Sequence, residues 1–145
     1  MIKVKILKDD SAKDLPLPRY MTAGSSGMDI CANATVILKP GEWVAIPTGL
    51  FVAVPNGFEL QIRPRSGMAA KHGVTVLNSP GTIDADYRGE IKVLLINHSH
   101  EPYQVERGSR VAQMVLSSVP IMLLEETDAL PATKRNKGGF GHTGE

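Results

Sequence analysis

The sequence predicts an all-β domain whose short strands form a barrel, a sandwich or a jelly roll. Apolar and polar residues alternate along several short segments, which is the period of half-buried strands. The 145 residues include 14 Gly and 10 Pro but only 5% aromatic residues, a balance that favours strands joined by turns over long helices. The length suits one domain, and a hydrophobic fraction of 42% is enough for a packed core.

The alternating segments predict strands separated by turns. In chain order, the alternation covers Val4 to Ile6, Leu50 to Val54, Leu60 to Ile62 and Ile91 to Leu95. Between and beside them lie the Pro- and Gly-containing segments 39–42, 54–58, 79–81 and 87–90, which predict turns. Proline presets φ for a turn, and glycine accepts the positive φ that tight turns need.

One short helix is predicted, with Ser66 as its N-cap and Gly73 as the residue that ends it. A strand delivers Arg63-Pro64-Arg65 to the start of this helix. Free backbone N–H groups and the helix dipole attract anions there, so phosphate is the natural ligand. The alternative is that Ser66 only caps the helix and the arginines are only solvated.

A second candidate site is the segment 73–89, in which two apolar strands flank a connection that carries Asp84, Asp86 and Tyr87. Backbone groups of such an open hairpin can pair with the edge of a pyrimidine. Either aspartate could orient and deprotonate a water molecule, and the spacing does not choose between them. The alternative is that both acids are solvated in a turn.

The C-terminal end differs in composition from the rest of the chain. We predict a β-barrel domain over residues 1–124 and a flexible arm over residues 125–145, which is rich in Gly and cations and contains Phe140. Such a composition is typical of a disordered end. An aromatic residue among glycines, preceded by cations, can also close over an anionic planar ligand.

Charge and cysteine content exclude several classes of protein. The 16 basic and 15 acidic residues leave a formal net charge of +1, which argues against a nucleic-acid-binding protein with a broad positive field. The single cysteine, Cys31, suits a reducing cytoplasm. We find no P-loop pattern, no signal peptide and no apolar run long enough for a membrane span.

Taken together, the motifs resemble those of the trimeric deoxyuridine triphosphate nucleotidohydrolases (dUTPases), over nearly the whole chain and in the usual order. The five segments that carry the resemblance are Ala23–Ile30, Pro64–Ala69, Asn78–Gly89, Arg107–Met114 and Arg135–Gly144. One such motif would be weak evidence, whereas five in register are specific. The resemblance implies a jelly-roll-like distorted barrel with an extended C-terminal arm, assembled as a homotrimer with shared active sites.

The resemblance also implies an enzyme that converts dUTP and water into dUMP and pyrophosphate, which limits uracil in DNA and supplies dUMP for thymidylate synthesis. It makes Asp84 the catalytic carboxylate and Mg²⁺ the cofactor, held mainly by substrate phosphates, with Asp29 assisting through a metal-bound water. Expected substrate-binding residues are Arg65, Ser66, Gly67, Asn78, Gly81, Ile83, Tyr87, Gln113, Arg135, Phe140, Gly141, His142 and Thr143. No nucleic acid and no membrane is expected as a partner.

Two residues depart from the family pattern. His142 stands where the last motif usually has Ser, and Ser109 stands where an acid is common. One alternative function is a regulatory trimer that binds a protein partner in a nucleotide-dependent way. A less favoured alternative is dCTP deaminase, because deaminases that resemble this hairpin carry a Glu on the next strand, where this chain has Val93-Leu94-Leu95.

Overall fold

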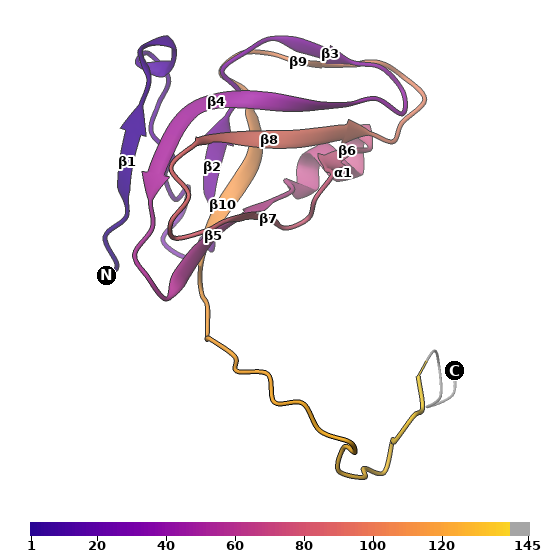
Figure 1. The fold of residues 1–145 in the computed structure, drawn as a ribbon. Coiled ribbons are helices and arrows are strands. Elements are labelled where there is room, and N and C mark those ends of the chain that lie inside the picture. The colour runs from indigo at the N-terminus through magenta and orange to yellow at the C-terminus, as the bar shows by residue number, and fades with distance from the viewer. Residues whose placement is uncertain (140–145) are drawn as a thin grey trace.

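The computed structural model, which describes residues 1–139, is built of two four-stranded sheets and one two-stranded sheet (Figure 1). The strand orders are β1-β4-β8-β6, β2-β10-β5-β7 and β3-β9. The strands are β1 (Lys5–Lys8), β2 (Met28–Cys31), β3 (Val36–Leu38), β4 (Trp43–Ala53), β5 (Phe58–Arg63), β6 (Val74–Val76), β7 (Gly81–Ile83), β8 (Glu90–Asn97), β9 (Tyr103–Val105) and β10 (Arg110–Ser118). The predicted all-β class is confirmed, although the sheets remain open at their edges.

The two larger sheets enclose one hydrophobic core. Alternation along β8 buries Ile91, Val93 and Leu95, and β5 buries Leu60 and Ile62 in the same core. Their neighbours along each strand face outward, as expected when one face of a sheet is buried. The predicted strand around Val4 and Ile6 is present as β1, but Ile6 is exposed.

Turns join the strands at two of the predicted segments, 39–42 and 54–58. Gly41 and Gly57 have φ values of +75° and +83°, the left-handed region in which glycine pays no steric penalty. The Glu42 N–H donates to the Lys39 carbonyl and the Phe58 N–H to the Pro55 carbonyl, at 3.0 and 3.2 Å. These two turns set the ends of the long strand β4.

The short helix α1 (Ser66–His72) lies where it was predicted, with one correction at its start. The N-cap is Arg65, with no side-chain cap bond, so the prediction of Ser66 as N-cap is wrong. Arg65 is the last residue with an extended backbone, and Ser66 is already helical. Gly73 ends the helix in the left-handed conformation, as predicted.

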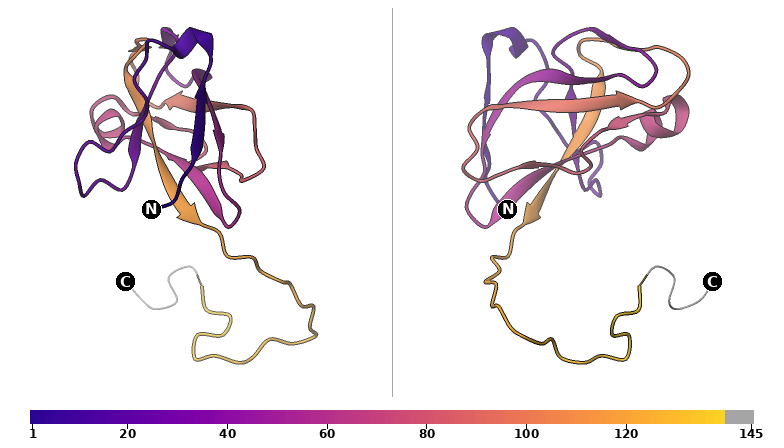
Figure 2. Two further views of the ribbon diagram at one scale, coloured as in Figure 1. Left: turned by 90° about the vertical axis from the view of Figure 1, so that its left-hand side faces the viewer. Right: turned by 45° about the vertical axis from the view of Figure 1, so that its right-hand side comes forward.

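The chain also has a 3₁₀ turn, η1 (Asp10–Ala12), and residues 119–139 hold no strand or helix. Figures 1 and 2 show this segment running away from the sheets after β10 ends. Within residues 1–139 there is no helix that is both long enough and apolar enough to cross a bilayer.

Candidate functional site

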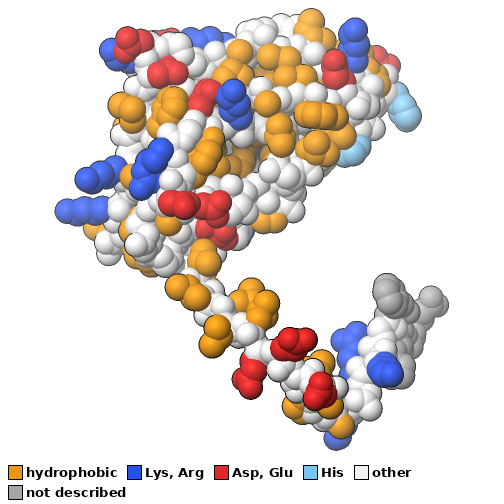
Figure 3. All heavy atoms as spheres, viewed as in Figure 1, with side chains coloured by type: hydrophobic (Ala, Val, Ile, Leu, Met, Phe, Trp, Pro, Cys, Tyr) orange, Lys and Arg blue, Asp and Glu red, His pale blue; other side chains and the backbone are white. Residues whose placement is uncertain are grey.

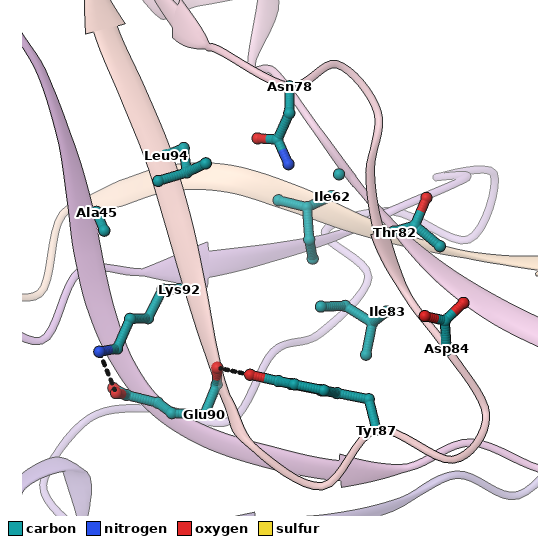
Figure 4. A pocket seen from close by; sticks show the side chains of 11 residues that line it. Ala45, Ile62, Asn78, Thr82, Ile83, Asp84, Tyr87, Glu90, Lys92 and Leu94 are labelled. Atoms are coloured by element: carbon teal, nitrogen blue, oxygen red, sulfur yellow. Dashed lines mark hydrogen bonds and ion pairs between the residues drawn. The ribbon is translucent and has the colours of Figure 1, made fainter.

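A pocket of about 490 Å³ lies where β7 and the loop after it face β8. Five of the predicted site residues line it: Asn78, Gly81, Ile83, Asp84 and Tyr87. Figure 4 shows them with the other lining side chains, from β4, β5 and β8. The volume falls within the range of small-molecule sites.

The strand β7 supplies this pocket with backbone groups. It pairs with β5 on one side, with Gly81 opposite Ile62 and Ile83 opposite Leu60. It is the last strand of its sheet among residues 1–139, so no strand pairs with its other edge. An unpaired strand edge presents N–H and C=O groups that can pair with a ligand.

Gly81 also brings Asn78 close to that edge. A Cβ atom at Gly81 would lie 3.1 Å from the Asn78 Nδ2 atom and 3.4 Å from the Ile62 Cβ atom. A side chain larger than hydrogen would therefore push the Asn78 amide away. The glycine lets an amide and a free strand edge share one wall of the pocket.

The structure distinguishes between the two aspartates that spacing left equivalent. Asp84 follows β7 directly and lines the pocket, and Figure 4 places its carboxylate beside Thr82. Asp86, two residues on, is exposed and does not line the pocket. Of the two aspartates, Asp84 is therefore the one whose carboxylate can act on a molecule bound there.

Tyr87 lines the pocket, and the residue is 42% exposed. Its hydroxyl donates to the Glu90 carbonyl at 3.0 Å, and its N–H donates to the Asp84 carbonyl at 3.2 Å. Figure 4 shows the ring extended from the loop toward Glu90. The hydroxyl bond holds the far end of the ring, and the backbone bond holds the loop that carries it. The ring therefore has a defined position in the pocket.

A second group of predicted residues surrounds Asp29 on β2. The Arg65 Nε atom donates to Asp29 Oδ1 at 3.2 Å, and the Arg110 Nη1 atom donates to Asp29 Oδ2 at 3.0 Å. The Arg65 Nη1 atom also donates to the Arg110 carbonyl at 2.9 Å. Two guanidinium groups thus share one carboxylate, and the excess positive charge suits an anion.

Gln113 lies on β10, opposite Asp29 of β2 and Arg63 of β5. Its Nε2 atom donates to the Pro64 carbonyl at 3.0 Å. A Cβ atom at Gly27 would lie 2.5 Å from the Gln113 Oε1 atom, so a larger residue at position 27 would displace this amide. The side chain of Gln113 is therefore held beside the start of α1.

Ser66 and Gly67, the first residues of α1, are both exposed. A Cβ atom at Gly67 would meet no atom within 4 Å, so space is open in front of the helix. Neither these residues nor Arg65 and Gln113 line the pocket of Asp84. The predicted site residues therefore form two groups on the described chain.

The predicted residues of the arm lie apart from both groups. Arg135 is exposed, and its Nε atom donates to the Gly138 carbonyl at 2.8 Å. Phe140, Gly141, His142 and Thr143 lie outside the described residues. Their roles stay predictions.

A network around Arg107 fixes the loop before β10. Arg107 donates to both carboxylate oxygens of Asp14, at 2.7 and 2.8 Å, and to the Ser11 carbonyl at 2.7 Å. These hydrogen bonds lower the pKa of Asp14 from its usual 3.8 to about 2 and raise the pKa of Arg107.

On β2, burial raises the pKa of the Cys31 thiol, which makes it a poor nucleophile.

Three charged residues at these sites were not predicted. Glu90 and Lys92 line the pocket with Asp84, and alternation along β8 gives the signal, since they face away from the buried Ile91 and Val93. Arg110 pairs with Asp29 across 81 positions of sequence, which no local pattern indicates.

Few protein side chains at these sites could coordinate a metal ion. Residues 1–139 contain no group of three His, Cys, Asp or Glu side chains that could hold an ion. Asp29, the predicted metal-assisting residue, uses both carboxylate oxygens on arginines. Any Mg²⁺ ion would therefore take most of its oxygen ligands from the substrate and from water.

The open β fold, the pocket at a free strand edge and the arginine cluster define a class of small β protein with a site for an anionic small molecule. The family model described as dUTPase matches residues 13–144. The chain belongs to the dUTPase family.

Curated relatives support this assignment along the full chain. The protein named deoxyuridine 5'-triphosphate nucleotidohydrolase from Wolbachia pipientis subsp. Culex pipiens (strain wPip) is 56% identical, with 99% of this chain and 96% of that protein covered. The protein of the same name from Thermoanaerobacter sp. (strain X514) is 54% identical, with 99% and 98% covered.

Solved structures agree on the fold. The dUTPase of Staphylococcus bacteriophage 80alpha with dUPNHPP superimposes with a TM-score of 0.88 at 23% identity and covers 99% of both chains. A mutant dUTPase from phage phi11 of S. aureus, whose structure describes the coordination of a structural Mg(II) ion, has a TM-score of 0.80 at 20% identity and covers 90% of this chain and 99% of that one. The jelly-roll-like fold predicted from the motifs is thereby confirmed.

Proposed function

We propose that this protein hydrolyses dUTP to dUMP and pyrophosphate. The observation that carries the proposal is one pocket in which a free strand edge, a flat tyrosine ring and the Asp84 carboxylate converge. Family membership and relatives named as nucleotidohydrolases at 54–56% identity support the same reaction. Those names also favour hydrolysis over deamination of dCTP.

The free edge of β7 is proposed to select uracil. Its N–H and C=O groups, with the Asn78 amide, form a fixed pattern of donors and acceptors. Cytosine presents a donor where uracil presents an acceptor, which leaves a polar group without a partner. Such a loss is a strong discriminator because the unpaired group remains desolvated.

Tyr87 is proposed to lie under the deoxyribose. Its ring is held by the hydroxyl bond to Glu90, and we propose that in this position it excludes a 2′-hydroxyl group. Asp84, at the end of β7, is proposed to orient the attacking water and take its proton. The water oxygen bonds to the α-phosphorus while the bond to the bridging oxygen of pyrophosphate breaks, and the proton goes to the Asp84 carboxylate.

The phosphate chain is proposed to bind the group at α1 and β10: Arg65, Ser66, Gly67 and Gln113. This group does not line the pocket of Asp84, and we propose that a second chain supplies it to the substrate. Arg135, Phe140, Gly141, His142 and Thr143 of a third chain are proposed to close over the nucleotide, with residues 125–145 as the arm. Closure excludes water and aligns the triphosphate.

Mg²⁺ is the proposed cofactor. Its chemistry, when bound, is to neutralise the phosphate oxygens and stabilise the charge of the leaving pyrophosphate. The donor set fits an ion carried by the substrate, since the described residues offer no three-ligand cluster. Asp29 would contact the ion only through water while keeping Arg65 and Arg110 in place.

Exposed apolar surface supports the proposed homotrimer. The segment after β10 carries Ile121, Met122, Leu123 and Leu124, each at least 80% exposed (Figure 3). An apolar groove of about 550 Å³ runs between β1 and β10, with Lys3 and Lys5 at its margin. Contiguous apolar surface of this kind is typical of an interface.

We propose that a trimer in the cytoplasm limits uracil in DNA and supplies dUMP for thymidylate synthesis.

Pyrophosphate release with Mg²⁺ tests the proposed function. The wild type should turn over dUTP and show little activity on dTTP, dCTP or UTP. Asp84→Asn should lose on the order of a hundredfold or more in kcat while still binding dUTP. Asp86→Asn is the matched control, because Asp86 does not line the pocket. Equal losses in the two variants, or no turnover of dUTP by the wild type, would refute the proposal.

A further inference from the structure

The backbone of Gly89 lies directly against the ring of Tyr87. A Cβ atom at Gly89 would lie 2.3 Å from Tyr87 Oη, 2.5 Å from Cζ and 3.0 Å from Cε2. These three atoms are the nearest ones to that position, and all belong to the same side chain. The tyrosine ring therefore rests where any residue other than glycine would place its side chain.

Backbone conformation gives no other reason for glycine at this position. Gly89 is not among the glycines with positive φ, so alanine fits its backbone without strain. The close approach of Tyr87 is what disfavours a larger residue there while the ring keeps its place. This separates Gly89 from Gly41 and Gly57, whose φ values alone disfavour other residues.

The residue that accepts the Tyr87 hydroxyl bond is itself anchored to β4. The Glu90 Oε1 atom accepts from the Thr48 N–H at 3.1 Å and from the Gly49 N–H at 2.9 Å. Thr48 in turn donates through its hydroxyl to the Ile91 carbonyl at 2.5 Å. These bonds fix the start of β8, and with it the carbonyl that holds Tyr87.

We propose that Gly89 is a positioning residue for sugar specificity, which it sets by seating the Tyr87 ring against the backbone so that the ring excludes a 2′-hydroxyl group. This inference rests on the proposed function. The position of the ring, and not only its presence, then decides between dUTP and UTP. Alanine at Gly89 forces the ring to move by about 1 Å to reach ordinary van der Waals contact.

The consequence is a loss of selectivity without loss of the fold. The ring is at the end of a side chain that is 42% exposed, so it can swing away from an added methyl group. A displacement of about 1 Å in a site can cost about a hundredfold in rate. We expect Gly89→Ala to lower the ratio of kcat/KM for dUTP to that for UTP by about tenfold or more.

The test is a double-mutant cycle with Gly89→Ala, Tyr87→Ala and the double variant, assayed on dUTP and UTP. The inference predicts that Gly89→Ala lowers the ratio in the wild-type background and leaves it unchanged in the Tyr87→Ala background, where the ring is absent. An unchanged ratio in Gly89→Ala, or equal effects in both backgrounds, overturns the inference.

A crystal structure of nucleotide-free Gly89→Ala supplies a readout that does not depend on activity. The inference predicts a displaced Tyr87 ring and a broken bond to the Glu90 carbonyl; a ring in its original place contradicts it. Failure of the proposed function is recognised separately, because the wild type would then show no preference for dUTP in the same assay.

Discussion

Replacement of Leu123 and Leu124 by serine is expected to break the assembly while leaving the folded chain intact. The two side chains are 95% and 86% exposed, so within one chain they contact almost nothing. In a monomer the double substitution would therefore change stability by a negligible amount. In a trimer that buries this segment, both substitutions remove apolar surface from an interface.

The size of the effect follows from the exposed surface. Full burial of a leucine side chain contributes about 1.5–3 kcal/mol, so the double substitution weakens each contact made by this segment by about 3–6 kcal/mol. Since about 1.4 kcal/mol corresponds to a tenfold change, the association constant should fall by roughly two to four orders of magnitude. A trimer at micromolar concentration should dissociate under such a loss.

Light scattering after size-exclusion chromatography measures this directly. The wild type should show three times the chain mass of 15.6 kDa, and Leu123→Ser/Leu124→Ser should show smaller species. Leu123→Met/Leu124→Met is the matched control, because methionine keeps the apolar surface and should keep the trimer. A serine variant that keeps the wild-type mass and melting temperature would refute the burial of this segment.

Two other variants probe contacts that hold the site. Gly27→Ala should displace the Gln113 amide, because the Oε1 atom would lie 2.5 Å from the new Cβ atom. This variant should lower kcat/KM for dUTP by about tenfold at little cost in stability. Unchanged kinetics would contradict a role for Gln113. Asp14→Asn should lower the urea midpoint at pH 7, because a carboxylate with a lowered pKa stabilises the fold above its unfolded value of 3.8. The gap to wild type should close as the pH falls from 3.8 to about 2, and a gap that does not depend on pH would exclude the Asp14–Arg107 pair as its source.

Much of the fold was predictable because alternation and turn residues act locally. The period-two pattern of Ile91 to Leu95 and the glycines at 41 and 57 place strands and turns without knowledge of the tertiary structure. The same alternation predicts that Ile6 is buried, whereas the structure exposes it. Ile6 lies on the edge strand β1 and lines the apolar groove. The alternation there fits a surface that a second chain would cover.

The candidate site was predictable only in part, because its contacts join distant segments. Spacing could not separate Asp84 from Asp86, and only the path of the chain after β7 puts one of them in the pocket. No local pattern predicts the ion pair of Arg110 with Asp29, because only the pairing of β2 with β10 brings the two residues together. The sequence predicts Ser66 as the N-cap, whereas the N-cap is Arg65, because serine suits either the cap or the first turn of a helix.

Attack of water on the α-phosphorus of dUTP is the step that Asp84 is proposed to direct. Hydrolysis in water enriched in heavy oxygen, followed by mass spectrometry of both products, shows which phosphorus the water attacks. We expect the label to enter dUMP and pyrophosphate to stay unlabelled, because the new bond forms at the α-phosphorus. Label in pyrophosphate would mean attack at the β-phosphorus and would contradict the proposed mechanism.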